Sequence, residues 1–82
     1  MTVDKIRDIL NKEIPGMGKV VVDLVVRDLK IDPSAPTANN IKDLVNTALA
    51  RIKLFVGTQR VKDIVPKLAS FLPNGARDIK IE

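Results

Sequence analysis

Apolar residues recur at helical spacing from the start of the chain. The first set shares one face of a helix over residues 3–14: Val3, Ile6, Ile9, Leu10 and Ile14. Charged and amide side chains occupy the opposite side, and Thr2 can cap the start. The segment Pro15-Gly16-Met17-Gly18 should end this helix, because proline interrupts the hydrogen-bond ladder and glycine accepts a left-handed conformation.

A second helix is expected to begin near Gly18. Its polar residues form a narrow stripe, made of Lys19, Asp23, Arg27 and Lys30. The rest of the surface is apolar and consists of Val20, Val21, Val22, Leu24, Val25, Val26, Leu29 and Ile31. Consecutive valines also suit a β-strand, but the segment length and the spacing of the polar stripe favour a helix. Such a wide apolar surface predicts a central, mostly buried helix.

The longest amphipathic pattern follows a linker over residues 32–37, which two prolines stiffen and which offers Ser34 or Thr37 as the next N-cap. It predicts a third helix from about Ala38 to Val56. Its apolar face comprises Ile41, Leu44, Val45, Ala48, Leu49, Ile52, Phe55 and Val56.

Gly57-Thr58 offers a turn and a new N-cap before a fourth helix. The apolar positions of that helix are Val61, Ile64, Val65, Leu68, Ala69 and Leu72. Pro66 lies inside this pattern and should kink or restart the helix. We expect Ile79 and Ile81, in a short tail over residues 73–82, to dock loosely on the core.

A tripeptide of a basic residue, Asp and then Ile or Leu recurs five times. The copies begin at Arg7, Arg27, Lys42, Lys62 and Arg77, so their spacing alternates between 20 and 15 residues. The resulting 35-residue period predicts a duplicated helical hairpin, with one repeat over about 3–37 and the other over about 38–72. The sequence therefore predicts one all-α domain over 1–82, a compact bundle of four to five short helices. A fragment of an α-solenoid is a further interpretation of the period.

Composition restricts the chemistry available to this chain. The 82 residues include no Cys and no His, which excludes disulfides, thiolate nucleophiles, Cys/His zinc sites and imidazole bases. Asp and Glu are scattered beside Lys or Arg, with no carboxylate pair for acid–base catalysis and no dense acidic loop for calcium. We therefore expect a protein without enzymatic activity, cofactor or metal. No signal-peptide pattern and no apolar run of about 18 residues occurs, so a cytoplasmic location is expected.

The first turn carries a motif. Ile14-Pro15-Gly16-Met17-Gly18, followed by apolar residues at Val22, Val25 and Val26, resembles the hairpin of the helix-hairpin-helix family of DNA-backbone binders. In that family the glycines let the backbone approach a phosphate, to which amides at the start of the next helix donate. The resemblance implies a phosphate site at Gly16, Met17, Gly18 and Lys19. The same glycines also suit an ordinary helix C-cap and tight turn.

The excess of basic residues agrees with an acidic partner. The formal charge is +4, and the basic residues Arg51, Lys53, Arg60 and Lys62 flank the Gly57 turn. With no Tyr or Trp to stack on bases, a nucleic acid would be contacted through its backbone. The leading hypothesis is a small nucleic-acid-backbone-binding module. The alternative is a helical protein-interaction or lipid-contacting module, or a homodimer, that acts through an apolar surface.

Overall fold

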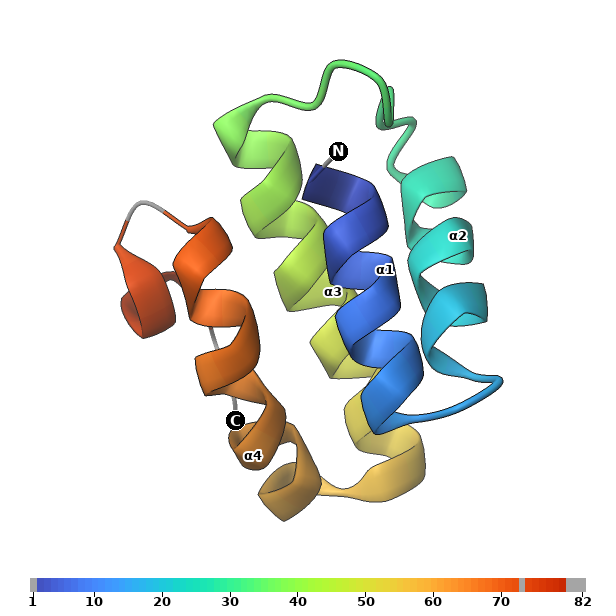
Figure 1. The fold of residues 1–82 in the computed structure, drawn as a ribbon, viewed down its shortest axis with the longest axis vertical. Helices are drawn as coiled ribbons and strands as arrows, with labels where there is room; N and C mark the ends of the chain where they lie inside the picture. Colours follow the sequence, from blue (N-terminus) through green and yellow to red (C-terminus); the bar gives the residue numbers. More distant parts are fainter. Residues whose placement is uncertain (1, 73, 80–82) are drawn as a thin grey trace.

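Four α-helices account for most of the chain in the computed structural model, which describes residues 2–72 and 74–79 (Figure 1). The helices are α1 (Thr2–Glu13), α2 (Gly18–Asp28), α3 (Ala38–Val56) and α4 (Thr58–Leu68), followed by two 3₁₀ turns, η1 (Ala69–Phe71) and η2 (Gly75–Asp78). The described ranges contain no strand. The predicted all-α class is confirmed.

The helices alternate in direction along the chain. In Figure 1, α1 and α3 run from the top of the view to the bottom, and α2 and α4 return upward. Helices α1 and α3 contact each other, and each of them also contacts both α2 and α4. As a result α1 and α3 form the middle of the bundle, and α2 and α4 flank it on opposite sides.

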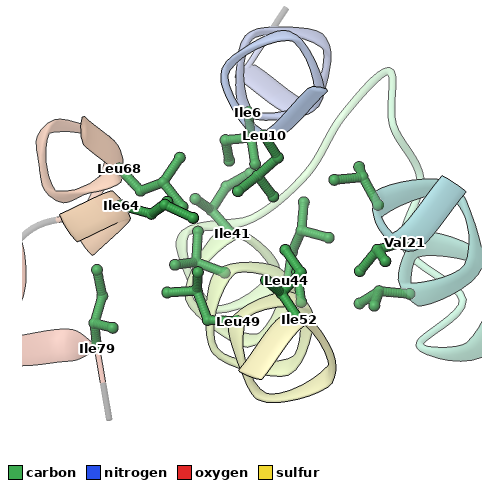
Figure 2. Close-up of a cluster of buried hydrophobic side chains, with 14 of the residues drawn as sticks. Ile6, Leu10, Val21, Ile41, Leu44, Leu49, Ile52, Ile64, Leu68 and Ile79 are labelled. Carbon is green, nitrogen blue, oxygen red and sulfur yellow. The ribbon is translucent and has the colours of Figure 1, made fainter. Parts of the chain in front are cut away.

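The core consists of aliphatic side chains directed between the four helices (Figure 2). The members that are fully buried are Ile6, Leu10, Val22, Val25, Leu44, Val45, Ala48, Leu49, Ile52, Val61, Ile64 and Leu68. No polar or charged side chain in the described residues is buried with them. Hydrophobic burial therefore supplies the main stabilisation of the bundle.

Local signals set the limits of α3 as predicted. The Thr37 hydroxyl accepts a hydrogen bond from the Asn40 amide at 3.0 Å, and the Asn40 side-chain oxygen accepts one from the Thr37 amide at 3.0 Å. This reciprocal capping box satisfies two amides at the helix start. At the other end Gly57, with φ +86°, makes the one-residue connection to α4.

Two predictions about burial are wrong. Helix α2 is a flanking helix rather than the central one: Val20 is 46% exposed and Leu24 is 38% exposed. The uniform valine run of α2 carries no indication of which arc faces the core. Phe55 is 67% exposed, although its helical phase matches the buried face of α3. It lies in the last turn of α3, beside Gly57.

Smaller differences occur at helix ends. Thr2 is the first residue of α1 and not its cap. Helix α4 continues through Pro66 without restarting, and the chain tightens into η1 after Leu68. Leu72 is therefore beyond the helix, yet it is buried, as is Ile79 from the predicted tail. The prediction for Ile81 lies outside the described residues.

Candidate functional site

The Gly16 turn uses its own amides internally. Gly16 has φ +82°, which glycine adopts readily, and its amide donates to the Asn11 side-chain oxygen at 3.2 Å. The amides of Met17 and Gly18 both donate to the Ile14 carbonyl oxygen, at 3.1 and 2.9 Å. A phosphate-binding turn needs amides that point to the ligand. In this conformation three of those amides already have acceptors within the protein.

Gly18 has a packing role. It is buried, and a Cβ atom on it would lie 2.3 Å from the carbonyl carbon and oxygen of Leu10 and 2.5 Å from the amide nitrogen of Asn11. Only a residue without a side chain allows the start of α2 to approach the backbone of α1 this closely. The glycine that the helix-hairpin-helix resemblance assigned to phosphate contact therefore also joins two helices.

Two of the predicted basic residues are engaged in ion pairs. Arg51 on α3 contacts Asp28 at the end of α2, with 2.8 Å between Nη2 and Oδ2. Arg60 on α4 donates from Nη2 to the Glu13 carbonyl oxygen at 2.9 Å and lies 3.6 Å from the Glu13 carboxylate. Lys67 also contacts that carboxylate. These pairs tie α3 to α2 and α4 to α1.

The ion pairs change the acidity of their carboxylates. A hydrogen bond from Lys67, with the nearby charges of Lys67 and Arg60, holds the pKa of Glu13 below its ordinary value despite partial burial. A hydrogen bond from Arg51, with the charges of Arg51 and Arg27, lowers the pKa of Asp28 in the same way. Both carboxylates are therefore ionised partners at neutral pH.

The remaining predicted cations are Lys19, Lys53 and Lys62. Within the part of the chain that the structure describes, no carboxylate pairs with any of them. The turn that contains Gly16 and the turn at Gly57 lie at the same end of the bundle (Figure 1). The fold therefore brings the two predicted basic segments to one end, with the lysines more available than the arginines.

The most exposed large apolar side chains were not predicted as a site. Leu54 is 85% exposed and Phe55 is 67% exposed, next to each other near the end of α3. Adjacent helical residues point about 100° apart, so two consecutive large apolar residues widen the apolar arc beyond the core face. This local excess is the sequence signal that could have indicated a surface role.

An ion pair links the helix faces that carry exposed apolar residues of α2 and α3. Val20, Leu24 and Asp28 are spaced by four residues and form one row on α2. Leu54 and Phe55 are three and four residues beyond Arg51, so they share its side of α3. Because Arg51 contacts Asp28, the two rows border the same seam. We name the four apolar side chains Val20, Leu24, Leu54 and Phe55 the α2–α3 surface.

Neither a metal site nor a membrane-spanning helix occurs in the residues that the structure describes. The described residues contain no group of three or more acidic side chains placed to hold a metal ion. Among the same residues, no helix has the length and apolar character required to span a bilayer. No protein-family model, curated protein or solved structure matches the chain.

Proposed function

We propose that this protein is a non-enzymatic helical interaction module that binds another protein through the α2–α3 surface. The observation that carries the proposal is the exposure of Leu54 and Phe55, at 85% and 67%, in a helix whose other large apolar residues are mostly buried. Helical surfaces that bind partners present apolar anchors with polar residues around them. Here the ion-paired residues Arg27, Asp28 and Arg51 are on the same two helices as the anchors.

The fold supports this function better than it supports catalysis. Helix α2 packs against α3 through the core, so the apolar anchors are held on two packed helices rather than on a loop. Preorganised anchors lose little conformational entropy on binding. The cytoplasmic location expected from the sequence belongs to the same proposal.

A photo-crosslinking experiment tests the proposed function. Phe55 is replaced with the photoreactive aromatic p-benzoylphenylalanine, and the protein is irradiated in the cells that produce it. The matched control carries the same group at Asp63, an exposed residue of α4. We expect protein adducts at position 55 only. The crosslinked partner should then bind the purified wild type and bind the Leu54→Ser variant more weakly. Equal adducts at both positions, or none at position 55, would contradict the proposal.

Binding of a nucleic-acid backbone is a second candidate function. It is favoured by Lys19, Lys53 and Lys62, which have no carboxylate partner in the described ranges, and by the shared end of the Gly16 and Gly57 turns. About three phosphate contacts would give a salt slope of about 2.7, so affinity should fall roughly 40-fold between 50 and 200 mM salt.

Anisotropy titration of labelled duplex DNA at these two salt concentrations tests the second candidate. Salt-sensitive binding that Lys19→Glu abolishes is the expected result, with Lys5→Glu as the control because Lys5 is an exposed lysine of α1. Equal loss with both variants would indicate only a general charge effect. No binding at tens of micromolar protein in 50 mM salt would exclude this function.

The duplicated hairpin remains an evolutionary proposal. Its support is the 35-residue period and the pairing of Ile6 with Ile41 and of Leu10 with Val45, which are all buried. Against it, the period that relates α1 to α3 does not relate α2 to α4, because α3 is 19 residues long and α1 is 12. Homologous sequences in which the 35-residue period relates α2 to α4 as well as α1 to α3 would support the duplication.

A further inference from the structure

We infer that the partner at the α2–α3 surface is a second copy of this chain, paired through a two-fold axis. The inference rests on the proposed function, since it names the occupant of the same surface. Two observations favour a second copy: the amount of apolar surface left open and the charges beside it.

The open apolar area suits a small symmetric interface. The four side chains are 46%, 38%, 85% and 67% exposed. With about 150–200 Å² for a fully exposed side chain of this size, each copy presents about 400 Å² of apolar surface. Complete coverage of both surfaces by a two-fold pairing would remove about 800 Å² of apolar surface from water, and the surrounding polar groups raise the total to about 1,000 Å². This total is at the lower limit for a specific interface, which predicts a weak dimer.

The charges beside the surface are compatible with a second copy. Asp28 lies 3.6 Å from Arg27 and 2.8 Å from Arg51, so cations and an anion alternate at the edge of the apolar residues. In a two-fold interface each surface meets itself, and an edge with both signs can place anions opposite cations. An edge whose side chains all carried the same charge would repel the same edge of a second copy.

The position of Leu29 provides a matched control. Leu29 is 41% exposed, similar to Leu24, but it caps the C-terminal end of α2 and is outside the α2–α3 surface. Each substitution in a two-fold interface acts twice, because both copies carry it. Leu54→Ser should therefore weaken the dimer strongly, while Leu29→Ser should leave it unchanged.

Sedimentation equilibrium of the full chain from 5 µM to 1 mM measures the association. The weight-average mass of the wild type should rise from 9.0 kDa toward twice that value, with a dissociation constant of about 10–100 µM. Leu54→Ser should raise that constant at least about tenfold, and circular dichroism should show an unchanged helix content. Added salt should change the association little, because apolar contact carries it and salt screens mainly interactions between exposed charges.

Two results would overturn the inference. One is a wild type that stays monomeric at 1 mM; the other is a dimer that Leu54→Ser and Leu29→Ser affect equally. The crosslinks at position 55 separate this failure from failure of the proposed function. Adducts of twice the chain mass support self-association. Adducts to a different protein support the proposed interaction surface but contradict a second copy as its partner.

Discussion

Gly18 lies against the backbone of Leu10, so closely that an added Cβ would be 2.3 Å from two Leu10 backbone atoms. The neighbouring glycine differs, because nothing lies within 4 Å of a Cβ built on Gly16. One turn therefore contains a glycine required by helix packing and another required by backbone conformation.

Replacement of these two glycines should have unequal effects. Gly18→Ala forces α2 away from α1, because the obstructing atoms belong to the backbone, and we expect a loss of about 3 kcal/mol in the free energy of unfolding. Gly16→Ala meets only the cost of a left-handed conformation, about 1 kcal/mol. Urea denaturation of both variants measures the difference. Equal losses would contradict the packing role of Gly18.

The two sides of α3 should respond differently to truncation. Ile52 is fully buried, so Ile52→Ala should reduce the free energy of unfolding by about 3–4 kcal/mol through lost burial and a cavity. Leu54→Ala, two residues later, should change it by no more than about 0.5 kcal/mol because that side chain is 85% exposed. Thermal melts at low protein concentration check this without a contribution from self-association. A large loss for Leu54→Ala would show that the residue packs in the monomer.

The capping box at α3 should be measurable as a coupling. Thr37→Ala removes the acceptor for the Asn40 amide and should cost about 1 kcal/mol. Because Asn40 also accepts from Thr37, the double substitution with Asn40→Ala should cost less than the sum of the single substitutions. Asn39→Ala is the control, since Asn39 is exposed and outside the box. Additive losses in chemical denaturation would contradict the reciprocal cap.

The Glu13 contacts predict a specific response to acid. Lys67 and Arg60 lower the pKa of Glu13 in the folded protein relative to its unfolded value of about 4.3. The stabilisation is therefore fully present above the unfolded pKa and is lost as pH falls through the lower folded pKa. Glu13→Gln should reduce stability at pH 7 and make the denaturation midpoint less dependent on pH between about 5 and 2.

Other carboxylates provide the comparison for this experiment. Asp28 and Asp32 also have lowered pKa values, through Arg51 and Ser34 respectively, so Glu13→Gln should reduce the acid response without abolishing it. Asp63→Asn, on the exposed side of α4, is the control substitution. If Glu13→Gln and Asp63→Asn behaved alike, the Glu13 contacts would not contribute to stability.

The sequence predicts the parts of the fold that depend on neighbouring residues. The α3 limits follow from Thr37 and Gly57, and its buried residues from Ile41 to Ile52 follow from helical periodicity. The position of α2 could not be predicted in this way, because Val20 and Val22 have the same chemistry but only Val22 faces the core. Which valine is covered depends on where α1 and α3 lie.

In the predicted site, too, local features could be predicted from the sequence and contacts between helices could not. The motif correctly indicates a turn at Gly16, but the close contact between Gly18 and Leu10 depends on how α2 packs on α1. Similarly, the basic character of Arg51 and Arg60 is evident in the sequence, whereas their partners Asp28 and Glu13 are 23 and 47 residues away. Ion pairs at such separations cannot be inferred from local spacing.

The contacts of Glu13 have a kinetic consequence. Most packed helices are neighbours in the sequence, joined by connections as short as Gly57, so each helical hairpin can form from local contacts. Arg60 and Lys67, at 47 and 54 residues from Glu13, join the first helix to the last. A topology dominated by local contacts folds in microseconds to milliseconds. We expect the docking of α4 on α1 to be the late step, so that loss of the Glu13 contacts accelerates unfolding far more than it slows folding.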